Sequence, residues 1–126
     1  MKKQLIIFCF LLGSTLSYSQ LYINEFMASN ASIIQDPDYS GDADWIEIYN
    51  DGNSAVNLDG YFLSDNVGVA NKWAIGNVTI PAKGYAIFWA DGNDSANHTN
   101  FKLDAQIEQI GLFKPDLLHN KTNARR

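Results

Sequence analysis

Cysteine is almost absent from this sequence, since Cys9 is the only one and lies in an apolar segment near the N-terminus. Bulky Phe8 precedes Cys9 and only a few apolar residues come before it, so the segment does not fit a lipoprotein signal. Without further cysteines, the rest of the chain can form no internal disulfide. Its stability must therefore come from packing, or from packing together with a bound ion.

Positive charge is also scarce. The 126 residues include 9 lysines and arginines against 14 aspartates and glutamates, which gives a net charge of −5. Removing residues 1–19 takes away Lys2 and Lys3 and no acid, so the net charge becomes 7 − 14 = −7. An acidic chain is poorly suited to phosphate backbones, so no nucleic-acid partner is expected. The same charge suits a surface that binds cations.

The chain begins with a short charged and apolar segment. Lys2 and Lys3 precede the apolar run Leu5–Leu12, and the small residues Ser17 and Ser19 stand where a signal peptidase would recognise them. The run is much shorter than the roughly 20 residues that span a bilayer. These features predict a signal peptide over residues 1–19, cleaved before Gln20. We expect a secreted, periplasmic or cell-surface protein with no membrane span in the mature chain.

A helical period of apolar residues is missing throughout the sequence. Short aromatic and β-branched segments instead alternate with turn signals about every eight to twelve residues, a pattern typical of an antiparallel β-sandwich or barrel. The predicted fold class is therefore all-β. Strands are predicted at residues 21–28, 45–50, 56–58, 61–64, 72–75, 78–80, 85–90, 101–103 and 109–113.

Two features refine this prediction. Segment 85–90 (YAIFWA) is apolar on both faces, which suits a central strand covered on two sides. The three tryptophans are expected to fill the core, because large aromatic side chains stabilise mainly through burial; they are Trp45, Trp73 and Trp89.

The C-terminal residues do not continue the strand pattern. Residues 117–126 (LLHNKTNARR) show no alternation, so we predict one domain over residues 20–116 followed by an irregular tail. This ending is either a basic tail or a reading frame that stops before the domain is complete, which would leave an unpaired sheet edge. The DNA sequence beyond Arg126 distinguishes the two.

Several segments, in this order, resemble the bacterial lamin-tail domain family. They are LYINEFMASN (21–30), DWIEIYN (44–50), LDGYFLSD (58–65), IPAKGYAIFWADG (80–92), HTNFKL (98–103) and residues 110–113. The resemblance implies an immunoglobulin-like antiparallel β-sandwich. It further implies a non-catalytic module of a secreted or surface protein, a kind of module often joined to hydrolases or binding domains. The family has no catalytic residues to transfer to this chain.

The acidic loop, residues 36–44 (DPDYSGDAD), holds the strongest ligand signal. Counted from Asp36, its oxygen-bearing side chains and Gly41 fall at the offsets of an EF-hand calcium loop, ending at position 12 with Glu47. The candidate calcium ligands are Asp36, Asp38, Ser40, Asp42, Asp44 and Glu47. However, no helix is expected to flank the loop, and Glu47 falls inside a strand. The alternative is a solvated acidic loop in which Glu47 makes a local hydrogen bond.

A second polar loop, residues 91–97, is a weaker version of the same signal, and turn formation accounts for it. His98 has no histidine or cysteine near it in sequence, and His119 lies in the irregular tail, so both are predicted not to bind a transition metal. No catalytic motif is found, so no enzyme activity is expected.

Three functions stay open on the sequence alone. The first is a secreted, non-catalytic β-sandwich module that binds an unknown protein or polysaccharide at the cell surface. The second is a calcium-stabilised carbohydrate-binding or adhesion module that uses exposed aromatic residues beside the acidic loop. The third is the N-terminal fragment of a larger secreted hydrolase. Exposure of a tryptophan next to the acidic loop separates the first two, and the downstream reading frame tests the third.

Overall fold

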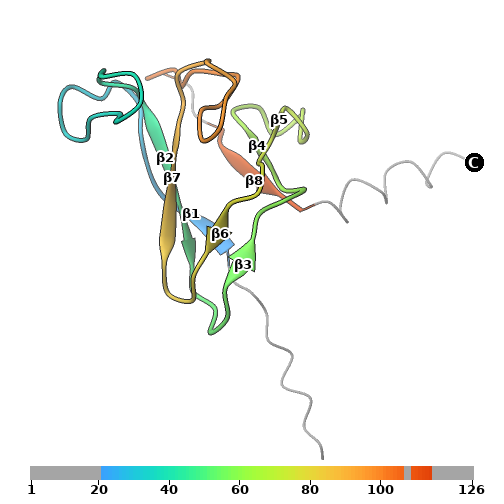
Figure 1. Cartoon of the computed structure of the whole chain (residues 1–126). Coiled ribbons are helices and arrows are strands. Elements are labelled where there is room, and N and C mark those ends of the chain that lie inside the picture. The colour runs from blue at the N-terminus through green and yellow to red at the C-terminus, as the bar shows by residue number, and fades with distance from the viewer. Residues whose placement is uncertain (1–20, 107–108, 115–126) are drawn as a thin grey trace, which may run out of the picture.

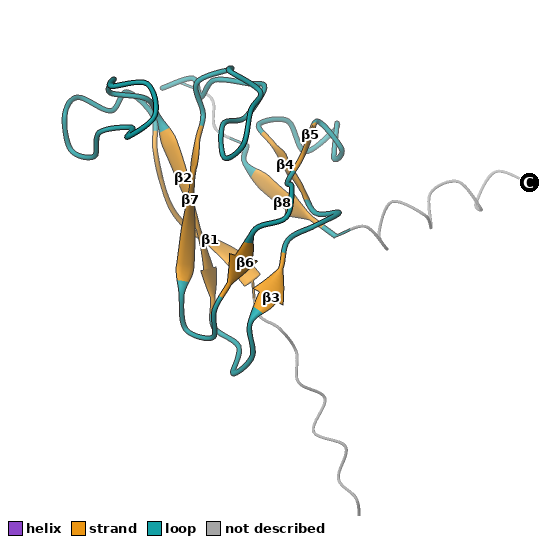
Figure 2. Cartoon of the chain, viewed as in Figure 1, coloured by secondary structure: helices purple, strands orange, loops and turns teal. Residues whose placement is uncertain are grey.

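A computed structural model of the chain describes residues 21–106 and 109–114. Figures 1 and 2 show these residues as strands joined by turns and loops. The predicted signal peptide and the predicted tail, residues 117–126, lie outside the described residues. Across the described part of the chain, no helix is long and apolar enough to cross a membrane.

Eight strands form within the described residues, and every strand pair is antiparallel. The strands are β1 (Leu21–Met27), β2 (Trp45–Asn50), β3 (Val56–Asn57), β4 (Phe62–Ser64), β5 (Trp73–Ala74), β6 (Thr79–Ile80), β7 (Tyr85–Trp89) and β8 (Gly111–Phe113). They pair in the orders β1-β2-β7, β3-β6 and β5-β4-β8. The all-β fold class predicted from the sequence is confirmed.

Alternation along β2 and β7 builds the core between the sheets. Ile46 pairs with Phe88 and Ile48 with Ala86, so these side chains share one face of the β1-β2-β7 sheet. Ile46, Ile48 and Phe88 are completely buried. Opposite them, Trp73 of β5 meets Phe88 edge to face, with ring centroids 5.9 Å apart. The core cluster is Ile46, Ile48, Leu58, Leu63, Trp73, Ile75, Ile80, Phe88, Ala90, Phe101 and Leu103.

The prediction that segment 85–90 is a central strand is wrong. β2 is central, and β7 lies at the edge of the three-stranded sheet, where Tyr85 is 62% exposed. The apolar residues on both faces of this segment are explained instead by what covers the C-terminal end of β7. There the backbone of Trp89 donates to Asn97 O and accepts from Thr99 N, so a loop rather than a strand covers this edge. Phe88 and Trp89 can therefore both be buried on opposite faces.

The tryptophans are buried as predicted, but only one belongs to the main core. Trp73 lies in the core cluster and is 5% exposed. Trp45 and Trp89 pair across β2 and β7 on the opposite face of the sheet, yet they are only 2% and 6% exposed. The loops between β1 and β2 and after β7 lie at this end of the sheet (Figure 1). The sheet therefore buries apolar residues on both faces where these loops meet it.

The strand predicted at residues 101–103 is absent from the described structure. Lys102 forms only an isolated bridge with Asp91, whereas Phe101 and Leu103 are buried in the core. Thr99 fixes this segment locally, because its Oγ1 donates to Phe101 O at 2.6 Å. The alternation that suggested a strand therefore reflects two core contacts made by an irregular segment.

A close backbone approach at Gly84 gives a first testable expectation. Gly84 N donates to Pro81 O at 2.9 Å and closes a tight turn before β7. A Cβ at Gly84 would lie 2.7 Å from Pro81 Cγ and 3.0 Å from Pro81 O. Gly84→Ala is therefore expected to lower the free energy of unfolding by about 1–3 kcal/mol, measured by urea denaturation.

Gly76→Ala is the matched control, because nothing lies within 4 Å of a Cβ placed there. This variant should be neutral or slightly stabilising, since alanine restricts the unfolded chain. Equal destabilisation by the two substitutions would contradict a specific clash at Gly84.

Candidate functional site

The connection between β1 and β2 is an ordered loop with its own hydrogen bonds. Asn30 is 7% exposed, and its side-chain Nδ2 donates to Ile34 O and to Ala43 O at 2.6 and 3.0 Å. Further along, Asp36 N donates to Gly41 O at 3.1 Å, and Ser40 N donates to Asp36 O at 3.2 Å. Pairing these backbone groups closes the start of the acidic loop into a compact turn.

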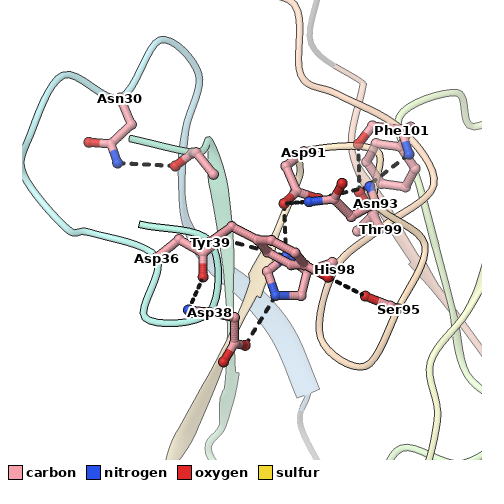
Figure 3. Close-up of polar contacts among 11 residues, drawn as sticks. Asn30, Asp36, Asp38, Tyr39, Asp91, Asn93, Ser95, His98, Thr99 and Phe101 are labelled. Carbon is pink, nitrogen blue, oxygen red and sulfur yellow. Dashed lines mark hydrogen bonds and ion pairs between the residues drawn. The ribbon is translucent and has the colours of Figure 1, made fainter. Parts of the chain in front are cut away.

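This turn directs two carboxylates toward the loop that follows β7. His98 Nε2 lies 3.2 Å from Asp38 Oδ2, and His98 Nδ1 lies 2.8 Å from Asp91 Oδ2. Asp36 Oδ2 lies 3.7 Å from His98 Nδ1. Figure 3 shows the imidazole between Asp38 and Asp91, with Tyr39 beside it. We call Asp36, Asp38, Asp91 and His98 the Asp–His cluster.

Surrounding contacts hold the imidazole of His98 in place. His98 N donates to Ser95 O at 2.8 Å, and Ser95 N donates to His98 O at 3.1 Å. The ring of Tyr39 meets the imidazole edge to face, with centroids 4.8 Å apart, and its hydroxyl lies 3.2 Å from Ser95 Oγ. The acidic loop and the loop after β7 therefore contact each other through both polar and aromatic groups.

Burial and charge act in opposite directions on His98. Its side chain and that of Asp36 are each 1% exposed, whereas the side chain of Asp38 is 63% exposed. Burial alone lowers the pKa of His98, but hydrogen bonds to Asp91 and Asp38 raise it, and the net result is a pKa above the ordinary 6.5. A carboxylate can only accept, so these two contacts together require both ring nitrogens to carry protons. The cluster therefore favours an imidazolium.

The remaining predicted calcium ligands do not join this cluster. Asp44 Oδ1 accepts from Asn30 N at 2.9 Å, and Asp42 Oδ2 lies 3.4 Å from Ser32 Oγ. Glu47 lies inside β2 and accepts a hydrogen bond from Asn24 Nδ2 at 2.7 Å. Ser40 contributes its backbone N–H to the turn. The structure thus brings Asp36 and Asp38 together, and calcium binding by the six-residue set stays a prediction.

Sequence reasoning missed the grouping of His98 and Asp91 with the acidic loop. His98 was predicted not to bind a transition metal, and the loop that contains Asp91 was attributed to turn formation. The turn is present, because Asn93 N donates to Asp91 Oδ1 at 3.0 Å. The second role of Asp91 depends on pairing Trp45 with Trp89, which places the residues before β2 and after β7 at one end of the sheet. Predicting that β2 and β7 pair antiparallel would have placed Asp91 and His98 next to the acidic loop.

Comparison with known families agrees with this architecture. A model of the family described as LTD, Lamin Tail Domain, matches residues 14–123. The match includes every described strand. No curated protein and no solved structure gave a match. The chain belongs to the lamin tail domain family and has its immunoglobulin-like β-sandwich fold.

Proposed function

We propose that this chain is a secreted, non-catalytic β-sandwich module that binds a partner at the cell surface. Membership of the lamin tail domain family supports a non-catalytic module. The predicted signal peptide supports secretion. The partner binds the outer face of the β1-β2-β7 sheet, away from the core.

The observation that carries this proposal is a row of tyrosines across that face. Tyr49 of β2 pairs with Tyr22 of β1 on one side and with Tyr85 of β7 on the other. The rings of Tyr22 and Tyr49 meet edge to face, with centroids 5.6 Å apart. Tyr22 is 42% exposed and Tyr85 is 62% exposed. Tyrosine is enriched at protein interfaces, because one side chain offers apolar area and a hydroxyl.

Charge next to the tyrosine row indicates the chemistry of the partner. Glu25 and Glu47 are directly opposite each other in the β1–β2 register. Two like charges in this position destabilise a strand pair. The hydrogen bond from Asn24 to Glu47 offsets part of that repulsion. A lysine or arginine from a partner would relieve the rest, so a basic protein surface fits this face best.

The test compares capture of surface proteins by the purified chain and by a Tyr22→Ser/Tyr85→Ser double variant. Both side chains are exposed, so the variant should keep its fold. Losing two central aromatic contacts is expected to weaken binding of the captured partner by about 30-fold or more, measured by biolayer interferometry. A Val67→Ser/Val69→Ser variant is the control, because these residues are exposed on the loop between β4 and β5. Equal binding by the two variants, or no capture by the wild-type chain, rejects this face as the binding site.

Carbohydrate binding is a second candidate function for the same surface. A sugar ring can stack on exposed aromatic side chains, and Tyr22 and Tyr85 offer two such rings at 42% and 62% exposure. All three tryptophans are buried, so tyrosines would have to form the platform. Affinity electrophoresis in gels containing soluble polysaccharides tests this candidate with the same variants. Retardation of the wild-type chain that the double variant loses would favour a polysaccharide over a protein partner.

A further inference from the structure

The strongest unexplained feature outside the tyrosine row is the buried carboxylate of Asp36. Its Oδ1 accepts a hydrogen bond from Asp38 N at 2.9 Å. Its Oδ2 is buried without a hydrogen-bond partner. Oδ2 lies 3.7 Å from His98 Nδ1, which is within reach of an ion pair with the imidazolium but too long for a hydrogen bond. Burying a carboxylate oxygen without a hydrogen bond is costly, so native structures usually provide such a group with a donor or an ion.

We propose that Asp36, Asp38 and His98 bind a divalent transition ion, with zinc as the best fit. Each of the three residues offers one ligand atom, and these atoms lie within 4.8 Å of one another. Ligands at about 2.1 Å from a tetrahedral zinc ion are roughly 3.4 Å apart. The 3.2 Å separation between His98 Nε2 and Asp38 Oδ2 is close to that value. The 3.7 Å contact of Asp36 Oδ2 is to Nδ1, so the Asp36 carboxylate shifts toward Nε2 when it binds the ion.

Donor chemistry favours zinc over calcium at this position. Calcium takes six to eight oxygen ligands, whereas an imidazole nitrogen with carboxylate oxygens suits zinc and its neighbours in the first transition row. The ion would replace the proton on His98 Nε2. Asp38 is exposed and can adjust to the ion, while a solvent molecule completes a fourth position.

Asp91 then acts as a positioning residue. Its Oδ2 lies 2.8 Å from His98 Nδ1, and its side chain is 14% exposed. Metal-binding histidines commonly donate their second N–H to a carboxylate, which fixes the ring and increases its basicity. Asp91 already provides that contact, and Asn93 Nδ2 donates to the same oxygen at 2.6 Å.

The site joins segments that are distant in sequence. Asp38 and His98 are 60 residues apart. An ion held between them would fasten the acidic loop to the loop after β7. Because these ligands come together only in the folded chain, the ion stabilises the native state in proportion to its concentration. This inference does not depend on the tyrosine row, and either proposal can fail alone.

The experiment uses the full chain after removal of metals with a chelator. ZnCl2 is expected to raise the melting temperature, and CaCl2 at the same concentration is not. CoCl2 is expected to give visible d–d absorption of a tetrahedral site, and zinc should displace it. No zinc-induced shift together with no cobalt absorption contradicts the proposal. A calcium-induced shift without a zinc-induced one would instead support the predicted calcium loop.

Variants identify the ligands. Loss of an outer carboxylate partner typically weakens metal affinity about 10–100-fold, so Asp91→Asn should fall in this range and loss of a direct ligand should cost at least as much. Asp38→Ala tests a direct ligand without disturbing the core, because this side chain is exposed. His98→Gln should abolish the cobalt absorption, but a buried substitution can also unfold the chain. Asp38→Ala therefore decides the outcome if His98→Gln does not fold.

Two control variants exclude other sites. Asp42→Asn alters the same loop outside the cluster and should leave zinc affinity unchanged. His119→Gln removes the second of the two histidines and should also have no effect. Zinc binding that survives Asp38→Ala and His98→Gln, or that is lost with His119→Gln, shows that the ion binds elsewhere.

Discussion

Phe88→Ala is expected to lower the free energy of unfolding by about 3–5 kcal/mol, the cost of removing a buried phenylalanine side chain. Phe88 is completely buried in β7, and its ring meets Trp73 of β5 at 5.9 Å. It therefore links the β1-β2-β7 sheet to the opposite sheet. For a domain of this size, such a loss corresponds to a fall of more than about 12 °C in Tm. Tryptophan fluorescence during thermal and urea unfolding measures both quantities.

Tyr85→Ala is the control for Phe88→Ala, since Tyr85 begins the same strand and is 62% exposed. Its effect should be about 0.5 kcal/mol or less. If the two variants have the same stability, Phe88 does not connect the sheets as described.

Asn50→Ala is expected to cost about 2–4 kcal/mol, because Asn50 is a buried hydrogen-bonding centre at the end of β2. Its Nδ2 donates to Ser54 O at 2.8 Å and lies 3.2 and 3.1 Å from the carbonyl oxygens of Ile80 and Pro81. Its Oδ1 accepts from Gly52 N at 2.9 Å. Alanine would leave several of these backbone groups without a partner in a site closed to water. Urea denaturation of the variant measures the loss.

Asn57→Ala provides the comparison for Asn50→Ala. The side chain of Asn57 also makes several hydrogen bonds, to Asn77, Thr79 and the backbone of Asp59, but it is exposed. Water can replace those bonds, so the expected cost is about 0.5–1 kcal/mol. A cost for Asn57→Ala as large as that of Asn50→Ala would mean that burial does not set the effect.

Most of the fold could be predicted because its strands have strong local signals. The alternation in WIEIYN predicts the bounds of β2, and the aromatic segment that starts at Tyr85 predicts the start of β7. The errors have one cause, which is that local pattern does not reveal what covers a side chain. Phe101 and Leu103 were predicted to lie in a strand, but they belong to an irregular segment whose side chains are buried in the core. Trp89 read as part of a central strand but is covered by the loop at residues 97–99.

The candidate site was less predictable than the fold. Asp36 and Asp38 stood out because they belong to a dense acidic segment. His98 gave no signal, since its partners Asp38 and Asp91 lie 60 and 7 residues away in sequence. Their approach depends on the pairing of β2 with β7, which is a tertiary property. Glu47 is the opposite case. Its spacing matched a calcium-loop ligand position, but in the structure it lies in β2 and its carboxylate accepts a hydrogen bond from Asn24.

The internal bonds of the loop between β1 and β2 decide where this domain can accept inserted sequence. Long surface loops usually tolerate insertions, but tolerance depends on the burial and hydrogen bonding of the affected backbone. The side chain of Asn30 binds Ile34 O within this loop and Ala43 O near its end, and Asp36 is buried in the same loop. Added residues there would separate groups that the fold holds together. The loop between β4 and β5, where Val67 and Val69 are exposed, is the better place for a tag or a fused domain.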